Sequence, residues 1–330
     1  MNSRKILRPL RAITMTAFGF FLLSLPGYSQ WQVTEISPPA PLVAGYELNL
    51  SKADIPIKPV DVKEPVITAK AGFAFDADSA VTLFAKNADQ PFMPASTTKI
   101  MTAIVALENY DPTDRITIKD EYLSIGSKSD LVAGETLTVA DVIKALLISS
   151  GNDAALALGQ HDKQGYNHFV DLMNQKAKEL HLENTHFSNV SGVEQSDHFI
   201  SARDLGFLTK TALENPIFAG IVSTPQTTIT NTDGTIIHQF ENTNQLLGEI
   251  PGVDGVKTGW TQKAGECLVT SISRQGHRVI VVLLDSTDRF GESTALINWI
   301  FKHYTWGAFP ADVIPRSPAP TSYQPPAPTL

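Results

Sequence analysis

Hydrophobic residues recur with regular periods between residues 68 and 304, and these periods predict an ordered domain. Two pairs of β-strands are expected within it. The segments "AGFAFDA" and "AVTLFAK" (71–77 and 80–86) flank a short polar turn, which is typical of a β-hairpin. Near the end of the domain, "AGECLVTSIS" and "HRVIVVLLD" (264–273 and 277–285) are separated by a turn containing glycine. The pattern therefore predicts a second hairpin there.

Helical spacing of apolar residues predicts the other elements. One helix follows Pro94 and contains Ser96. Another begins at a capping-box-like Thr138–Asp141 and carries a buried stripe of Val139, Val142, Ile143, Leu146 and Leu147. This helix breaks at Ser149-Ser150-Gly151, and the pattern resumes at about Asp153. Two further helices fit "YNHFVDLMNQKAKELH" and "ESTALINWIFKHY", residues 166–181 and 292–304.

The two ends of the chain have a different composition. Residues 1–29 combine four basic residues, an apolar stretch and a small-x-small ending, which is typical of a secretory signal peptide. Residues 30–64 form a proline-containing leader, expected to wrap the domain in part or to remain loose. The domain is predicted over 65–306. Residues 307–330 are rich in proline without periodicity, and a disordered tail is expected there.

Charge and composition exclude several classes of function. The formal charge is −8, and residues 1–29 carry four positive charges and no negative ones, so the remainder carries −12. Such an acidic protein is a poor binder of nucleic acid or anionic membrane. The single cysteine, Cys267, excludes an internal disulfide, and the eight histidines show no metal-ligand spacing. No cofactor, no metal and no transmembrane anchor after signal cleavage are expected.

The clearest candidate for chemistry is the pair Ser96 and Lys99. On a helix, residues three apart lie on the same face, so the hydroxyl and the amine can meet. Serine becomes a nucleophile when a base takes its proton, and a lysine can do so if burial keeps it neutral. Taken alone, however, a serine three residues before a lysine also arises by chance.

Two later motifs could complete such a site. Ser150-Gly151-Asn152 lies in the break between two helices, where a hydroxyl could relay a proton and an amide could bind a peptide carbonyl. Lys257-Thr258-Gly259 precedes the second strand pair, where it could bind a carboxylate at the edge of a sheet. Each of these motifs alone is more often an ordinary turn. Together and in this order, they match the motif set of penicillin-binding proteins and class A β-lactamases.

Longer segments extend this match. From about Thr68 to Tyr304 the chain resembles the low-molecular-weight penicillin-binding proteins, the D-alanyl-D-alanine carboxypeptidases. The resemblance is carried by "DADSAVTLFAKNADQPFMPASTTKIMTA", "LLISSGNDAALAL", "HFSNVSGVEQSDHFISARDLGFLTK" and "GVDGVKTGWTQKAGECLVTS". It implies an α/β fold like that of β-lactamases and transpeptidases. Such a fold has an antiparallel sheet flanked by helices and a mostly helical subdomain.

The resemblance also implies roles for individual residues. Ser96 would be the acylated nucleophile, Lys99 its general base and Ser150 the proton shuttle to the leaving D-alanine. Substrate binding would fall to the following residues: Asn152, Lys257, Thr258, Gly259, Trp260 and Arg289. The substrate would be a peptidoglycan stem peptide, and β-lactam antibiotics would inhibit. The protein would be exported to the periplasm or the cell-wall space.

Several alternatives stay open from the sequence. A D-alanyl-D-alanine endopeptidase that cuts peptidoglycan cross-links would carry the same motifs. A class A-like β-lactamase is disfavoured because its E-x-x-L-N signature is absent and Gly151 stands where an aspartate is expected. A catalytically weak peptidoglycan-binding protein is disfavoured by the intact Ser96, Lys99 and Ser150. Two departures from the family pattern are the missing second domain and membrane-binding helix, and the Asn189–Gly192 loop without its frequent proline.

Overall fold

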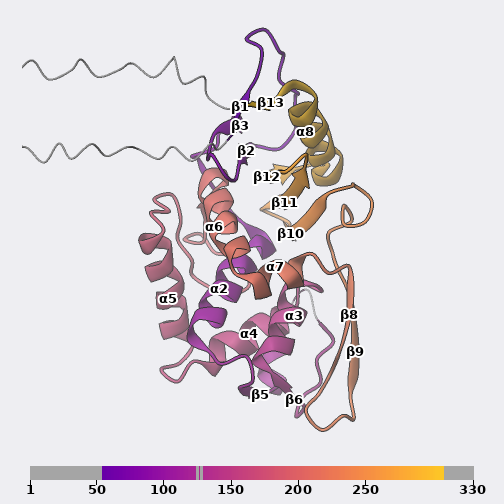
Figure 1. Ribbon diagram of the computed structural model, residues 1–330. Helices are drawn as coiled ribbons and strands as arrows, with labels where there is room; N and C mark the ends of the chain where they lie inside the picture. The colour runs from indigo at the N-terminus through magenta and orange to yellow at the C-terminus, as the bar shows by residue number, and fades with distance from the viewer. Residues whose placement is uncertain (1–53, 124–125, 127–128, 308–330) are drawn as a thin grey trace, which may run out of the picture. The chain divides into compact units, whose positions relative to one another are not determined.

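The computed structural model describes residues 54–123, 126 and 129–307 (Figure 1). The predicted signal peptide, the leader up to residue 53 and the tail from residue 308 lie outside the described residues. Among the described residues, no helix combines the length and the apolar character needed to cross a bilayer.

A five-stranded sheet in the order β10-β11-β12-β2-β3 forms one part of the domain, and all of its neighbouring strands are antiparallel. Both predicted hairpins are confirmed, as β2–β3 and β11–β12. The strand β10 is an edge strand and holds Lys257 within its length, paired with Val269. The strands run over Ala71–Asp76 (β2), Thr82–Lys86 (β3), Val253–Thr261 (β10), Gly265–Arg274 (β11) and His277–Ser286 (β12).

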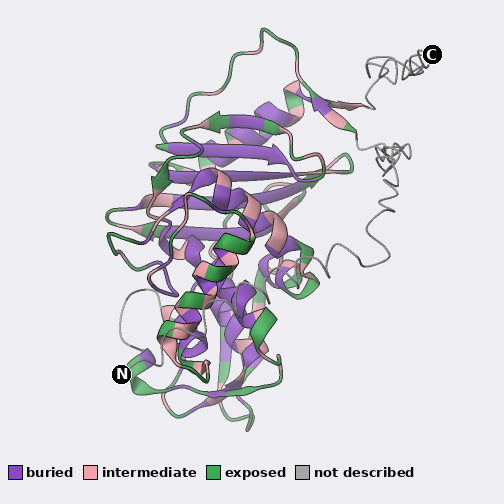
Figure 2. Cartoon of the chain, turned by 90° about the vertical axis from the view of Figure 1, so that its left-hand side faces the viewer, coloured by how far each residue is buried: buried purple, intermediate pink, exposed green. Residues whose placement is uncertain are grey.

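The sheet has a core on each face, so its central strands are buried on both sides (Figure 2). On one face, Val281 and Leu283 pack with Leu296 and Ile300 of the helix α8 (Arg289–His303). The other face packs against α6 (Ala202–Glu214) and the helices beyond it. Burial on both faces explains why "VIVVLL" in β12 is a continuous apolar run rather than an alternating one.

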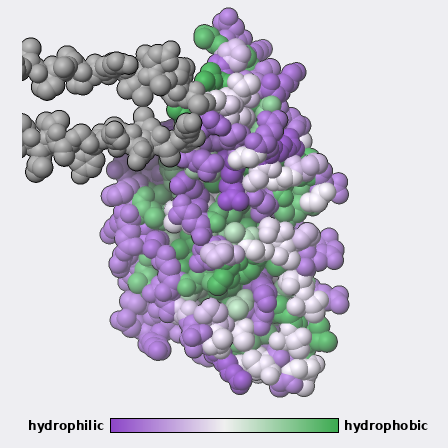
Figure 3. All heavy atoms as spheres, in the orientation of Figure 1, coloured by the Kyte–Doolittle hydropathy of each residue, from purple (hydrophilic) through white to green (hydrophobic). Residues whose placement is uncertain are grey.

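Helices make up most of the second part of the domain. The predicted helix start at Thr138 is confirmed, because Thr138 is the N-cap of α3 and its side chain accepts a hydrogen bond from Asp141 N at 3.1 Å. The helices are η1 (Ala95–Thr98), α2 (Lys99–Asn109), η2 (Asp120–Tyr122), α3 (Val139–Leu147), α4 (Asn152–His161), α5 (Tyr166–Glu179) and α7 (Pro216–Val222). Figure 3 shows hydrophobic and hydrophilic residues intermixed on one face of the molecule, with many hydrophobic ones over this helical part.

Pairs of short strands also occur outside the five-stranded sheet, and one of these pairs includes the end of the leader. The strand β1 (Ile55–Ile57) pairs with β13 (Thr305–Gly307), and Trp299 Nε1 donates to Lys63 O at 2.9 Å. Leader residues 54–64 therefore contact the end of the domain. The other pairs are β4 (Pro91–Phe92) with β7 (Ile200–Ser201), β5 (Arg115–Thr117) with β6 (Thr136–Thr138), and β8 (Gln226–Thr230) with β9 (Ile237–Glu241).

Candidate active site

Ser96 lies in a single 3₁₀ turn that leads directly into α2, whereas the sequence predicts a continuous helix. In 3₁₀ geometry, side chains three residues apart are eclipsed. Lys99, the first residue of α2, therefore places its Nζ 2.8 Å from Ser96 Oγ. The turn begins at Ala95, a buried residue with a positive φ of 49°, which alters the direction of the chain just before the serine.

Lys99 is completely buried, and the pKa of its amine differs from the usual value. Burial lowers the pKa of Lys99 to about 7, and the nearby Asp153 carboxylate opposes this shift. Lys99 Nζ also donates to Asn152 Oδ1 at 2.7 Å. A lysine with a pKa of about 7 is neutral in a large share of molecules at neutral pH, so it can accept the proton of the serine hydroxyl.

The second motif stands at the junction of α3 and α4, as predicted. Ser150 has a positive φ of 64° and is 5% exposed, and Gly151 caps α4, which begins at Asn152. A Cβ atom on Gly151 would lie 1.7 Å from Ser129 Oγ, so only glycine fits there. The tight junction brings the Asn152 amide to Lys99.

The third motif lies within the edge strand β10 rather than in an exposed turn. Lys257 is 1% exposed, and its pKa is lowered well below the usual value by burial, and further by the charges of Lys99 and Arg289. A Cβ atom on Gly259 would lie 3.0 Å from Ser96 N, so this strand runs directly beside the nucleophile turn.

Arg289 and Thr243 contact this strand from elsewhere in the chain. Arg289 begins α8, and its Nη1 donates to Gly259 O at 2.8 Å. Thr258 Oγ1 lies 2.7 Å from Thr243 Oγ1. The structure therefore brings the Ser96–Lys99 pair, Asn152, the Lys257–Trp260 strand and Arg289 into one region.

A cavity of about 520 Å³ opens at Ser96. Part of its wall is formed by two segments outside the three motifs, the loop after Asn189 and the β10–β11 turn. Trp260, 63% exposed, stands at its edge. Glu194 Oε1 accepts from Lys263 N at 2.8 Å and so ties the loop after Asn189 to the β10–β11 turn. No role was predicted from the sequence for several of the lining residues, some of which belong to the Asn189–Gly192 loop. They are Gly126, Ser191, Gly192, Val193, Glu194, Thr261 and Gln262.

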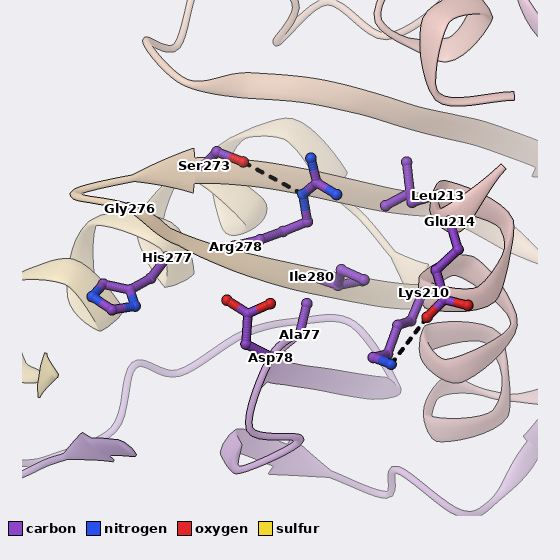
Figure 4. Close-up of a pocket in the computed structure, with 10 residues that line it drawn as sticks. All are labelled: Ala77, Asp78, Lys210, Leu213, Glu214, Ser273, Gly276, His277, Arg278 and Ile280. Atoms are coloured by element: carbon purple, nitrogen blue, oxygen red, sulfur yellow. Dashed lines mark hydrogen bonds and ion pairs between the residues drawn. The ribbon is translucent and has the colours of Figure 1, made fainter. Parts of the chain in front are cut away.

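A second cavity of about 500 Å³ lies elsewhere, between the β2–β3 turn, the end of α6 and the β11–β12 turn (Figure 4). Its charged groups include the Lys210–Glu214 ion pair and Arg278, which contacts Ser273 and Asp254. None of the motif residues lines it. No group of three or more metal-ligating side chains occurs in the part of the chain that the structure describes.

The sequence of the chain is similar to those of known proteins. Residues 58–288 match the family model described as D-alanyl-D-alanine carboxypeptidase. The D-alanyl-D-alanine carboxypeptidase DacF of Bacillus subtilis is 34% identical over 246 residues, which cover 72% of this chain and 63% of that protein. A D-alanyl-D-alanine endopeptidase of Pseudomonas aeruginosa is 32% identical over 233 residues, covering 68% of this chain and 74% of that protein.

Solved structures give the same fold. The crystal structure of the Streptomyces K15 DD-transpeptidase superposes with a TM-score of 0.70 at 33% identity, covering 73% of this chain and all of that one. This confirms the predicted fold, an antiparallel sheet flanked by helices with a mostly helical part. The family match spans the turn with Ser96 and Lys99, the junction with Asn152 and the edge strand with Lys257. The chain belongs to the D-alanyl-D-alanine carboxypeptidase family of peptidases.

Proposed function

We propose that this protein is a serine-type D-alanyl-D-alanine carboxypeptidase that removes the terminal D-alanine from peptidoglycan stem peptides. The observation that carries the proposal is the 2.8 Å contact between Ser96 Oγ and the buried Lys99 Nζ, at the mouth of a cavity large enough for a peptide. The names of the relatives supply the substrate class.

In the proposed reaction, Ser96 Oγ attacks the carbonyl carbon of the penultimate D-alanine while Lys99 takes the hydroxyl proton. The resulting tetrahedral intermediate collapses as the peptide C–N bond breaks. The leaving amine of the terminal D-alanine receives the proton through Ser150. Water then hydrolyses the acyl-serine ester, so one water is consumed and one free D-alanine is released per cycle.

The surrounding groups orient the substrate and stabilise the oxyanion. We assign the backbone N–H groups of Ser96 and Trp260 as the oxyanion hole, where removal of one donor typically costs about 3–4 kcal/mol. The Asn152 amide binds the substrate's peptide group. Lys257 and Thr258 bind the terminal carboxylate, assisted by Arg289. A substrate carboxylate beside Lys257 favours the protonated amine, so binding is expected to raise the Lys257 pKa.

This function requires export. We propose that residues 1–29 direct secretion and that the mature protein acts in the periplasm or cell-wall space, where its peptidoglycan substrate lies. The basic n-region followed by a short apolar stretch supports this assignment. β-Lactam antibiotics, which mimic the D-alanyl-D-alanine end, are expected to acylate Ser96.

An endopeptidase acting on cross-links is the second candidate. It is favoured by the name of the Pseudomonas aeruginosa relative and by the exposed Trp260, which leaves the edge of the cavity accessible. A cross-link places a side chain on the residue that leaves, so an endopeptidase needs space beyond the carboxylate site. The two activities differ in whether free D-alanine or shorter muropeptides are released.

The test is digestion of a mixture of monomeric pentapeptide and cross-linked dimer muropeptides, with products identified by mass spectrometry. We expect release of D-alanine from the pentapeptide while the dimers persist. Early loss of dimers with little free D-alanine would establish the endopeptidase instead. The Ser96→Ala variant, purified in the same way, serves as the control for contaminating hydrolases.

A further inference from the structure

A chain of three hydrogen bonds ends at the carbonyl group just before the nucleophile, and the last two of these bonds are buried. Ser188 N donates to His198 Nδ1 at 3.0 Å, so the ring proton lies on Nε2. His198 Nε2 then donates to Thr98 Oγ1 at 2.8 Å, and Thr98 Oγ1 donates to Ala95 O at 2.9 Å. Burial lowers the pKa of His198 to about 4, which keeps the ring neutral and this sequence of donors intact at neutral pH.

The carbonyl that receives this chain belongs to the same peptide group as the Ser96 N–H. A trans peptide is planar, so fixing the direction of Ala95 C=O also fixes the direction of Ser96 N–H. Ala95 adopts a φ of 49°, which is unfavourable for a residue with a Cβ atom. Neighbouring contacts must therefore hold this peptide in place.

The Asn189–Gly192 loop packs on the same carbonyl. Gly192 lies so close that a Cβ atom there would be 1.8 Å from Ala95 O. Asn189 Oδ1 holds the loop in this position by accepting from Ser191 N at 3.1 Å and from Gly192 N at 2.8 Å. Gly192 thus covers one side of the Ala95 carbonyl group, and the Thr98 hydroxyl donates to the oxygen of the same carbonyl.

We propose that His198 and the Asn189–Gly192 loop are positioning elements that aim the Ser96 N–H at the oxyanion through Thr98 and the Ala95–Ser96 peptide. This inference rests on the proposed function, because it requires the Ser96 N–H to be an oxyanion-hole donor. It gives a role to His198, which the sequence motifs did not single out, and to the loop, which they did.

The chain contains a matched control for this idea. Thr97, also completely buried, donates through its hydroxyl to Pro94 O at 2.7 Å, in the same turn. That carbonyl belongs to the preceding peptide, whose N–H is that of Ala95 rather than Ser96. Thr97→Val and Thr98→Val therefore remove the same kind of bond from adjacent positions, and only Thr98→Val releases the Ala95–Ser96 peptide.

The experiment measures acylation by a fluorescent penicillin under single-turnover conditions, which separates binding from the acylation rate constant. We expect Thr98→Val to lower that rate constant about 10- to 100-fold, less than complete loss of an oxyanion donor, with little change in initial binding. Thr97→Val should acylate at close to the wild-type rate. Equal rates in the two variants would overturn the proposal.

A spectroscopic measurement distinguishes a change in the direction of the Ser96 N–H from a general loss of rigidity in the fold. The carbonyl stretching band of the acyl-enzyme moves to lower frequency as its oxyanion-hole hydrogen bonds strengthen. We expect it at higher frequency in Thr98→Val than in wild type and unchanged in Thr97→Val. An unchanged band in Thr98→Val contradicts the proposal even if acylation is slow.

Two histidine variants address the case in which Thr98→Val fails to fold. His198→Gln keeps a donor near the Nε2 position and should restore most of the acylation rate that His198→Leu loses. Equal rates for these two variants would count against a relay through His198. A wild-type protein that forms no penicillin adduct would contradict the proposed function itself, which keeps the two failures distinguishable.

Discussion

Arg289 Nη1 donates a 2.8 Å hydrogen bond to the carbonyl oxygen of Gly259. Because a peptide is planar, this contact orients the Gly259–Trp260 amide, whose N–H is the second proposed oxyanion donor. Thr98 holds the carbonyl of the Ala95–Ser96 amide in the same manner. Side chains therefore hold both proposed donor peptides through their carbonyl groups.

Replacing Arg289 should separate two possible roles. If Arg289 mainly orients the Gly259–Trp260 peptide, Arg289→Leu should lower kcat about tenfold with little change in KM. If it mainly binds the substrate carboxylate, KM should rise instead. Steady-state kinetics on a D-alanyl-D-alanine peptide distinguish these outcomes. Arg274→Leu is the control, because Arg274 also donates to a backbone carbonyl, that of Pro251, but outside the site.

The pH dependence of acylation should follow the protonation of Lys99. Its pKa of about 7 means that the neutral, basic form increases as pH rises through that value. The rate of acylation should therefore rise between about pH 6 and pH 8 and then level off. Stopped-flow measurements with a penicillin would give the profile, and a rate that falls over this range would contradict the assignment.

Lys99→Arg should be inactive, because a guanidinium group does not lose its proton in proteins. The measurement is turnover of the D-alanyl-D-alanine peptide at pH 8, compared with Lys163→Arg at an exposed position before α5. The Lys163 variant should retain wild-type turnover. Near-normal activity of Lys99→Arg would exclude a neutral lysine as the base.

Lys257→Met should stabilise the fold while abolishing carboxylate recognition. The unfolded lysine keeps its proton up to about pH 10.4, and burial lowers the native pKa well below that. The unfolded state therefore binds more protons over the interval between the two pKa values, and wild-type stability rises with pH across it. A methionine of similar length avoids the cost of desolvating the amine.

We expect Lys257→Met to raise the free energy of unfolding by about 1–2 kcal/mol at neutral pH, with a smaller gain near pH 10. Urea denaturation at the two pH values checks this. A loss of stability at neutral pH would mean that Lys257 makes a net stabilising contribution in the folded protein.

Ser96 should be the residue that β-lactams modify. Intact-mass analysis after incubation with penicillin should show a single adduct that persists for many minutes, because no E-x-x-L-N glutamate is present to drive fast deacylation. The adduct should be absent in Ser96→Ala and present in Ser223→Ala, whose serine lies in the turn after α7. An adduct on the Ser96→Ala protein would refute the assignment.

The enzyme should prefer substrates that end in a free carboxylate. A charge-assisted hydrogen bond from Lys257 contributes about 1.5–3 kcal/mol, so a D-alanine terminus should be preferred over its amide by about ten- to a hundredfold. Competition between the acid and amide forms of one peptide measures the ratio. Lys257→Met should reduce it towards unity, and an unchanged ratio would place the carboxylate elsewhere.

The sequence by itself determined both hairpins of the large sheet and several helices, but it did not predict the strand β10 or the pairs of short strands. The two apolar segments around a polar turn in residues 71–86 and the apolar run in 277–285 were enough to locate β2, β3 and β12, because strand formation follows the local pattern of apolar and turn residues. The Thr138–Asp141 box located a helix start for the same local reason. The Ser96–Lys99 contact was also predictable, since three residues separate its partners and one helical turn brings them together.

The tertiary structure decided which of these motifs share a site. Asn152 reaches Lys99 across 53 residues, and His198 reaches Thr98 across 100. No periodic pattern encodes such contacts, and a single histidine carries no spacing that marks it. The motif Lys257-Thr258-Gly259 looked the same in sequence whether it formed an exposed turn or a buried edge strand.

The charge of Lys99 was also decided only by the fold. An exposed lysine keeps its proton at neutral pH, and the same residue in the same sequence motif becomes a base when packing removes it from water. That desolvation is a collective property of α2, the α3–α4 junction and the helices around them, which contribute residues distant in the chain. Local sequence places the amine beside the hydroxyl, and burial by distant segments lowers its pKa.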